Sequence, residues 1–118
     1  MLIAILPARS GSKRIKNKNI KNFLGKPIIS YTINRLKKSN LFDEIYVSTD
    51  SNKIAYVAKN YGAKVPFLRD KSLSGDKIST LDVIKGFLNN KYFMNKKIKL
   101  VCCVYPCTPL INIKDIEK

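Results

Sequence analysis

Residues 2–24 constrain the fold most, because a short apolar run is followed there by small residues and then by closely spaced cations. The run Leu2–Leu6 stops at Pro7 and predicts a buried β-strand. The next stretch, Ala8–Ser12, is small apart from Arg9, and small residues let main-chain N–H groups approach phosphate oxygens. The cations that follow are Lys13, Arg14, Lys16, Lys18 and Lys21. This pattern favours a polyphosphate site after a strand, although a solvated basic loop would have the same composition.

The charge balance of the chain points to anionic partners. The net charge is +15 over 118 residues, and no acidic residue precedes Asp43. Such an excess favours binding to a nucleotide, a nucleic acid or an anionic surface. Because lysine dominates and is spread along the chain, much of the charge can instead be a solvated surface, and we expect no specific nucleic-acid partner.

No segment predicts a membrane span or a secretion signal. Apolar runs stay well short of the roughly 20 residues that cross a bilayer. The amino-terminal residues are those of a strand and lack the charged region and cleavage site of a signal peptide. We therefore expect a cytoplasmic protein with no membrane partner.

The cysteines and the missing histidine limit the chemistry of the chain. There are three cysteines, and Cys102, Cys103 and Cys107 are clustered, which does not suggest a disulfide framework. Cys102 and Cys103 fall in an apolar run, so packing is favoured over a metal or redox role. Since the chain has no histidine, it contains no Ser-His-Asp or Cys-His arrangement.

Strand and helix patterns alternate along the chain. The predicted strands are Leu2–Leu6, Glu44–Ser48, Lys64–Leu68 and Ile98–Tyr105, of which the third is an edge or irregular strand because it contains Pro66. The first helix is predicted from Pro27, with an apolar face of Ile28, Ile29, Thr32, Ile33 and Leu36. The second is capped by Ser51, stopped by Gly62, and carries Ile54, Val57, Ala58 and Tyr61. The third begins at a capping box of Ser79 and Asp82 and buries Leu81, Ile84, Phe87 and Leu88.

This alternation predicts one α/β domain with a mostly parallel sheet and helices on its faces. Ligands of such folds bind at the carboxyl ends of the strands. That rule brings together Pro7–Lys18, Thr49–Asp50 and Pro106–Pro109. A further helix begins near Asn112 and Asp115 just before the sequence stops, so we interpret residues 1–118 as part of a larger domain.

Four motifs, in order along the chain, resemble those of one enzyme family, the acylneuraminate (nonulosonate) cytidylyltransferases, which include the CMP-sialic acid synthetases and their pseudaminic and legionaminic acid relatives. The first is Ile5–Ile15 with Lys18-Asn19-Ile20, and the second is Phe42–Asp50. The third is Tyr61–Ala63 with Val65–Arg69, and the fourth is Pro106–Leu110. The third motif, with Leu73-Ser74, is most similar to the pseudaminic acid branch.

The resemblance implies a fold and a reaction. The fold would be that of the Rossmann-like nucleotide-diphospho-sugar transferases, with residues 1–118 as the amino-terminal, nucleotide-binding part. The reaction would transfer CMP from CTP to an acidic nine-carbon sugar and release pyrophosphate with the help of Mg²⁺. Such transfer depends on positioning and charge neutralisation.

The resemblance also implies roles for particular residues. Arg9 would bind the triphosphate and stabilise the leaving pyrophosphate, for which the planar fork of arginine is well suited, and Lys18 would contact phosphate. Asn19 would lie near the base, and Arg69 would lie beside the cytosine pocket with Ser79 or Thr80, although Ser79 fits a helix cap better. The nucleotide-binding set is Ala8, Arg9, Ser10, Gly11, Ser12, Lys18, Asn19, Arg69, Ser79 and Thr80.

The chain departs from the family pattern in two positions and in length. Ser10 replaces a common glycine, and Tyr105 stands where many relatives have glutamine or another polar residue. Family members are about twice as long, and the aspartates that hold Mg²⁺, most of the sugar site and the homodimer contacts would lie in the other half. No metal ligand is therefore assigned in this chain.

Three other readings of the sequence stay open. A 3-deoxy-manno-octulosonate cytidylyltransferase shares the early arginine motif, but Lys18-Asn19-Ile20 favours the nonulosonate group. A non-catalytic basic module would explain the charge, but the aromatic residues do not form a stacking platform among basic residues. A dinucleotide-binding domain would need a G-x-G-x-x-G turn, which the sequence lacks.

Overall fold

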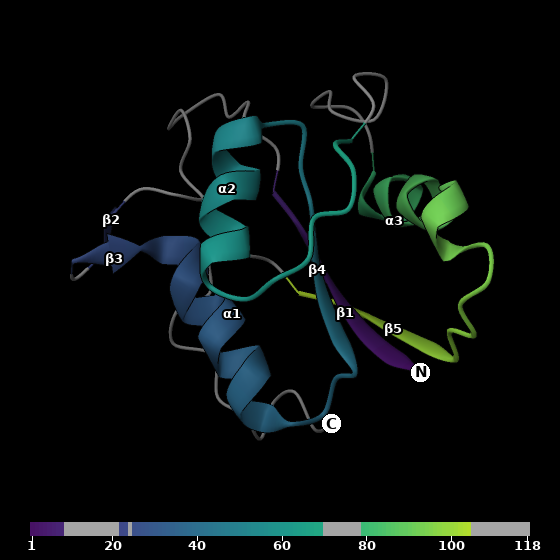
Figure 1. Cartoon of the computed structure of the whole chain (residues 1–118), viewed down its shortest axis with the longest axis horizontal. Coiled ribbons are helices and arrows are strands. Elements are labelled where there is room, and N and C mark those ends of the chain that lie inside the picture. Colours follow the sequence, from purple (N-terminus) through teal and green to yellow (C-terminus); the bar gives the residue numbers. More distant parts are fainter. Residues whose placement is uncertain (9–21, 24, 70–78, 105–118) are drawn as a thin grey trace.

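A three-stranded parallel sheet forms the centre of the protein. The computed structural model describes residues 1–8, 22–23, 25–69 and 79–104. In the described part the strand order is β4-β1-β5 (Figure 1). The strands are β1 (Leu2–Pro7), β4 (Glu44–Ser48) and β5 (Leu100–Cys103).

The register of the sheet brings the carboxyl ends of β1 and β4 together. Ile3 pairs with Glu44 and Pro7 with Ser48. On the other side of β1, Leu2 pairs with Leu100. A ligand that binds at the carboxyl ends of the strands would therefore meet the residues after Pro7 and Ser48 first.

Helices cover both faces of the sheet. Helices α1 (Ile28–Ser39) and α2 (Asn52–Asn60) lie on one face, and α3 (Thr80–Leu88) lies on the other (Figure 1). A short 3-10 helix, Lys91–Phe93, follows α3. The alternation of β1 side chains between the two faces divides the core in two.

The core on the α1 and α2 face is aliphatic, and the core on the α3 face is aromatic. On the first face Ala4 and Leu6 of β1 pack with Ile29, Ile33 and Ile54. On the second, Ile3 and Ile5 pack with three aromatic side chains, which are Tyr46, Phe87 and Phe93. The ring centroids of Tyr46 and Phe93 are 5.2 Å apart in an edge-to-face arrangement, which favours ring–ring attraction beyond simple burial.

Local signals fix helix α2, whereas the start of α1 differs from the prediction. Ser51 caps α2 by accepting a hydrogen bond from the Ile54 N–H at 3.2 Å, as predicted. Gly62, just past the end of α2, has a φ of +99°, which favours glycine. Pro27 is the residue before α1 rather than its first helical residue, and it also ends β3.

Three expectations about the elements are corrected, and one small element was not predicted. Lys64–Leu68 is not a strand: Lys64 forms one isolated parallel bridge with Tyr46, since Pro66 has no N–H to continue a ladder. Leu81 is 61% exposed rather than part of the buried face of α3. The fourth strand is shorter than predicted, because β5 covers only Leu100–Cys103. A small hairpin of β2 (Asn22–Phe23) and β3 (Lys26–Pro27), which turns at Gly25 with a φ of +87°, was not predicted.

The cysteines follow the packing prediction only in part. Cys102 packs against the aliphatic core, and its burial raises the pKa of the thiol, which favours the protonated form. Cys103 is exposed, so its side chain does not pack as a core residue within the described part of the chain. Cys107 lies outside the described residues.

Candidate functional site

A main-chain hydrogen bond links the carboxyl ends of β1 and β4. Ala8 is 1% exposed, and its N–H donates a hydrogen bond to the Ser48 carbonyl oxygen at 2.8 Å. The chain therefore leaves the sheet at Ala8 in a fixed position. The next predicted site residues, Arg9, Ser10, Gly11, Ser12, Lys18 and Asn19, lie outside the described residues.

Arg69 is brought to this same edge of the sheet. Its guanidinium donates to the Ser48 carbonyl oxygen at 2.7 Å through a terminal nitrogen and to the Ser48 hydroxyl oxygen at 3.2 Å through Nε. Its main-chain N–H donates to the Thr49 carbonyl oxygen at 2.6 Å. The side chain is only 9% exposed. Arg69 is thus a buried cation held rigidly beside the start of the segment after Ala8.

Segment 64–69 runs along β4 from one end of that strand to the other. At its start the Lys64 N–H donates to the Ile45 carbonyl oxygen at 2.8 Å, and the Val47 N–H donates to the Lys64 carbonyl oxygen at 3.0 Å. At its end Arg69 binds Ser48 and Thr49, as described above. Between these anchors Phe67 contacts the aromatic core, with its ring centroid 4.9 Å from that of Phe87. Packing and two end contacts, rather than a ladder, therefore place Arg69.

A pocket of about 350 Å³ opens beside Arg69. Its lining combines aromatic rings with polar groups and includes Ser48, Phe67, Arg69, Phe87, Asn89 and Asn90. Such a lining suits a flat, polar ligand, because rings can contact its face while a guanidinium and amides bind its edge. Only Arg69 of this group was predicted as a site residue; the two asparagines follow α3 and carry no local signal of a binding role.

Ser79 and Thr80 lie at the beginning of α3. Ser79 is exposed, and its hydroxyl oxygen accepts a hydrogen bond from the Asp82 N–H at 3.1 Å. This confirms the predicted cap. Thr80 is the first residue of the helix. A contact of either residue with a base stays a prediction.

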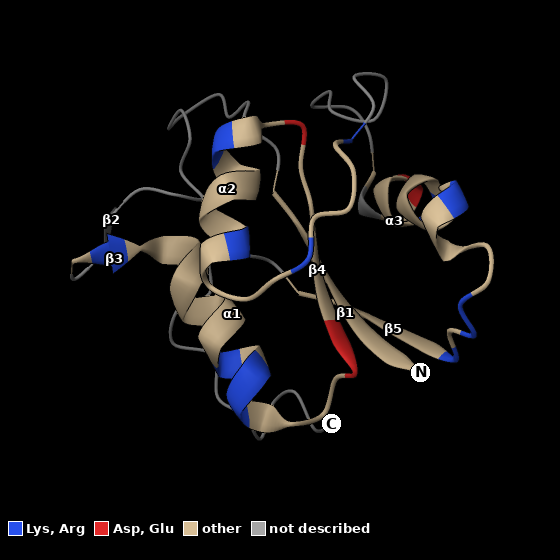
Figure 2. Ribbon diagram, in the orientation of Figure 1, with Lys and Arg blue, Asp and Glu red and all other residues tan. Residues whose placement is uncertain are grey.

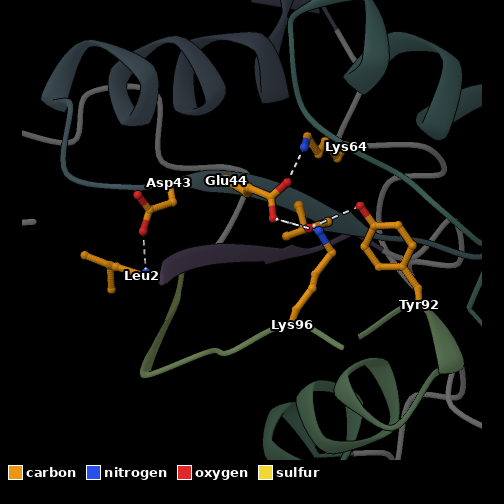
Figure 3. Close-up of polar contacts among 7 residues, drawn as sticks. Leu2, Asp43, Glu44, Lys64, Tyr92 and Lys96 are labelled. Atoms are coloured by element: carbon orange, nitrogen blue, oxygen red, sulfur yellow. Dashed lines mark hydrogen bonds and ion pairs between the residues drawn. The ribbon is translucent and has the colours of Figure 1, made fainter. Parts of the chain in front are cut away.

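A second polar cluster, at the amino end of β4, was missed in the sequence. Figure 3 shows Glu44 between Lys64 and Lys96. The Tyr46 hydroxyl donates to Glu44 Oε1 at 2.7 Å and lies 3.3 Å from the Tyr92 hydroxyl. Lys96 Nζ lies 3.3 Å from Glu44 Oε1 and 4.8 Å from the centre of the Tyr92 ring. We call Glu44, Tyr46, Lys64, Tyr92 and Lys96 the Glu44 cluster.

The Glu44 cluster holds a carboxylate in its charged form. Burial alone would raise the pKa of Glu44, but hydrogen bonds from Lys64, Tyr46 and Lys96 outweigh burial and lower the pKa to about 2. The hydrogen bond to Glu44 raises the pKa of Lys64 in turn. The cluster lies at the end of β4 away from Arg69 and serves to fix segment 64–69 and the connection to β5.

Charged residues are distributed over several elements of the described part. Figure 2 shows acidic residues at the beginning of β4, just before α2 and on α3, and cations on α1, α2 and α3. In the described part of the chain, no group of three or more His, Cys, Asp or Glu side chains is placed to hold a metal ion. None of the described helices is long and apolar enough to cross a membrane.

Comparison with known proteins assigns the chain to a family. A family model described as cytidylyltransferase matches residues 3–118. The pseudaminic acid cytidylyltransferase of Campylobacter jejuni subsp. jejuni serotype O:2 is 48% identical over 116 residues, which cover 98% of this chain and 50% of that protein. The CMP-N,N'-diacetyllegionaminic acid synthase of Legionella pneumophila is 39% identical, with the same coverage of 98% and 50%.

Solved structures show the same fold. A CMP:2-keto-3-deoxy-manno-octonic acid synthetase complexed with CTP superposes with a TM-score of 0.81 over 98% of this chain and 44% of that one, at 22% identity. A cytidylyltransferase from Leptospira borgpetersenii gives a TM-score of 0.72 at 26% identity, over 98% of this chain and 45% of that one. This likeness confirms the predicted Rossmann-like α/β fold. The chain spans about half the length of the curated relatives it matches. With a parallel sheet between helices, as predicted, and a family match over nearly its whole length, the chain belongs to the cytidylyltransferase family.

Proposed function

We propose that this chain is the CTP-binding part of an enzyme that transfers CMP to a nonulosonic acid of the pseudaminic type. The observation that carries the proposal is the placement of Arg69, a buried cation fixed on Ser48 next to the point where the cation-rich segment begins. The 48% identity to a pseudaminic acid cytidylyltransferase supports the choice of acceptor class. The pocket beside Arg69 would hold part of the nucleotide.

In the proposed reaction the anomeric hydroxyl oxygen of the sugar attacks the α-phosphorus of CTP. The new bond joins that oxygen to phosphorus, the bond between the α-phosphorus and the bridging oxygen breaks, and pyrophosphate leaves with the electron pair. The hydroxyl proton is lost to solvent or to a base. Arg9 and Lys18 would neutralise the triphosphate, which gains negative charge on the leaving group.

Arg69 would act on the base side of the nucleotide. Its guanidinium is already oriented by Ser48, so binding would cost little side-chain entropy. Arg69 and the segment after Ala8 would then contact opposite ends of one CTP molecule. Asn19, Ser79 and Thr80 complete the proposed base side, and Ala8, Ser10, Gly11 and Ser12 complete the phosphate side.

Mg²⁺ is part of the proposed reaction, but the described residues do not fit a metal site. Those residues bring together no three carboxylate, thiol or imidazole groups. We propose that the protein ligands of Mg²⁺ lie outside the described residues, and we derive no step through the metal. We also propose that the complete enzyme is cytoplasmic and, by resemblance to the family, a homodimer; sedimentation of that enzyme would test its oligomeric state.

Nucleotide selectivity tests the binding part of the proposal. CTP should raise the unfolding temperature of the 118-residue chain more than ATP or NAD, because a ligand that binds only the folded state stabilises it. A mixed oligonucleotide should bind weakly and lose affinity steeply as salt rises. A tight oligonucleotide complex that survives physiological salt, with no effect of CTP, would instead identify a nucleic-acid module.

Turnover tests the reaction and the acceptor. The 118 residues would be compared with a chimera in which they are joined to the second half of the Campylobacter jejuni relative. With CTP and Mg²⁺, the chimera should release pyrophosphate faster with pseudaminic acid than with N-acetylneuraminic acid or 3-deoxy-manno-octulosonic acid. The 118 residues alone should show no turnover. Turnover near the usual enzymatic scale of about 1 s⁻¹ by the 118 residues alone would contradict the division of the site between two halves.

A further inference from the structure

Helices α1 and α2 carry cations but no acidic side chain. Their charged residues are Arg35, Lys37, Lys38, Lys53 and Lys59. The two helices lie on the same face of the sheet, whereas α3 on the other face carries one charge of each sign (Figure 2). Because like charges on a surface repel one another, a face of this kind favours a partner of opposite charge.

Most of these cations have no counter-charge in the described part of the chain. Lys37 donates a hydrogen bond to the Tyr61 carbonyl oxygen at 3.4 Å, which links α1 to the residue that follows α2. The other four side chains are exposed and form no ion pair with a described residue; they are Arg35, Lys38, Lys53 and Lys59. Their charges are therefore available to a partner.

Helix stability accounts for some of these cations but not for Lys53. Lys38 and Lys59 lie in the last turns of α1 and α2, where a cation interacts favourably with the negative end of the helix dipole. Lys53 is the second residue of α2 and lies at the positive end of the dipole, where a cation is unfavourable. A residue that weakens its own helix without a local gain is typical of a functional surface.

An exposed aromatic ring lies among the cations of α2. Tyr56 is 69% exposed, and Lys53 and Lys59 come three residues before it and three residues after it. Side chains three residues apart are neighbours on a helix, so the ring has a cation on either side. Tyrosine is enriched among the residues that contribute most to protein–protein binding, and charged neighbours form the polar rim of such contacts.

We propose that the outer surface of α1 and α2 binds a second protein, one that presents Asp and Glu side chains around an apolar pocket for Tyr56. We call this surface the cationic face, and its members are Arg35, Lys38, Lys53, Tyr56 and Lys59. The proposal does not depend on CTP binding or on the reaction proposed above, because the cationic face belongs to helices that cover the sheet.

Other partners fit the cationic face less well. A lipid surface needs several large apolar side chains to enter it, and Tyr56 is the only one exposed on α1 or α2, both of which the structure describes completely. A single ring provides no row of stacking positions for a nucleic acid. A second copy of the chain offers only eight Asp and Glu residues against 23 Lys and Arg.

Two labelled acidic peptides test this partner chemistry by fluorescence anisotropy with the 118-residue chain. One forms a helix of glutamates with a stripe of leucines, and the other is polyglutamate of equal net charge. We expect the leucine peptide to bind more tightly, because it can contact Tyr56 as well as the cations. Both affinities should fall as salt rises, since exposed charges are screened.

Variants matched in charge locate the surface. The first variant replaces the four unpaired cations of the cationic face by alanine, and the second replaces four exposed lysines elsewhere, which are Lys85, Lys91, Lys97 and Lys99. The first should lower affinity for the leucine peptide by about tenfold or more, and the second by about twofold or less. Tyr56→Ala changes no charge, so it should lower that affinity by about threefold and leave polyglutamate binding unchanged. Thermal unfolding checks that each variant is folded.

Several results would overturn the proposal. Equal losses for the two charge-matched variants would show that binding follows net charge alone, and full affinity of Tyr56→Ala for the leucine peptide would exclude the aromatic contact. Failure of both peptides to bind would exclude an acidic protein partner. Tighter binding of an RNA oligonucleotide, or of vesicles that contain phosphatidylglycerol, would assign the cationic face to a different class of partner.

Discussion

Tyr46 donates its hydroxyl hydrogen to Glu44 Oε1 at 2.7 Å, from two residues further along the same strand. The two side chains share a face of β4, and the contact places a charged carboxylate at the edge of the aromatic core. Lys64 and Lys96 complete the environment of this carboxylate (Figure 3). Two segments distant in sequence, which lead to Arg69 and to β5, thus meet at Glu44.

Replacement of Glu44 should lower stability and flatten its acid dependence. Glu44→Gln removes charge-assisted hydrogen bonds, and because Lys64 is half exposed we expect a loss of only about 1–2 kcal/mol at pH 7. The pKa of about 2 lies below the ordinary 4.5, so the contribution of Glu44 is fully present above pH 4.5 and lost as pH falls toward 2.

Urea denaturation between pH 2 and pH 7 measures both effects of Glu44. The free energy of unfolding of Glu44→Gln should fall less steeply below pH 4.5 than that of the original chain. Tyr46→Phe keeps the carboxylate and the ring, so it should retain most of the acid dependence. Identical pH profiles for Glu44→Gln and the original chain would show that the cluster does not hold the carboxylate in its charged form.

Replacement of Arg69 should weaken CTP binding. Arg69→Ala removes the buried guanidinium at the pocket and should reduce affinity by ~10–100-fold, the effect of losing a hydrogen bond of about 1.5–3 kcal/mol. Arg69→Lys keeps the charge but loses the planar fork, so its CTP affinity should lie between those of the original chain and of Arg69→Ala. Calorimetric titration with CTP measures the loss, and Arg35→Ala, on the exposed surface of α1, is the control. If Arg35→Ala and Arg69→Ala lower the CTP affinity equally, Arg69 acts only through the overall positive charge and not through a direct contact.

Replacement of Arg9 should weaken binding in a way that salt does not remove. Arg9→Ala should lower CTP affinity by ~10–100-fold if the side chain contacts the triphosphate directly. Lys16→Ala removes a neighbouring cation that we expect to attract CTP only at long range. Its effect should be smaller and should vanish near 0.5 M salt, where charges are screened over about 4 Å. Calorimetry at low and high salt separates the two. An Arg9→Ala effect that disappears together with that of Lys16→Ala would exclude a direct contact.

Two glycine replacements should separate backbone strain from steric contact. Gly25 and Gly62 have φ values of +87° and +99°, so alanine at either should cost about 1 kcal/mol. A Cβ at Gly25 would meet no atom within 4 Å, whereas at Gly62 it would lie 2.5 Å from Lys37 Nζ. Gly62→Ala should therefore cost slightly more, and Lys37→Ala should relieve that excess. Urea denaturation measures each variant; an unchanged Gly25→Ala would mean that this turn tolerates the strain.

Elements with complete local signals were predicted correctly. Helix α2 has a capping serine, an apolar face and a terminal glycine, and each of these signals acts within a few residues. The strands β1 and β4 are apolar runs whose ends are marked by Pro7 and by polar residues. Segment 64–69 failed as a strand because Pro66 interrupts the hydrogen bonds that its side-chain pattern would otherwise predict.

The site could be predicted only where a motif is continuous in sequence. Arg69 was selected by resemblance, but its attachment to Ser48 is 21 residues distant and depends on the path of segment 64–69. In the Glu44 cluster, Lys64 and Lys96 are 20 and 52 positions from Glu44 in the sequence, so no local pattern predicts the cluster. Asn89 and Asn90 reach the pocket only because α3 packs on the aromatic face.

The Ser48 carbonyl oxygen accepts hydrogen bonds from both the Ala8 N–H and the Arg69 guanidinium. This one acceptor atom therefore sets the distance between Ala8, where the cation-rich segment starts, and the Arg69 guanidinium. That spacing is a property of the central sheet, since Ser48 is 1% exposed and ends β4. The distance between Ala8 and Arg69 therefore limits the size of a ligand that contacts both of them. A change in either segment alone would leave that distance unchanged.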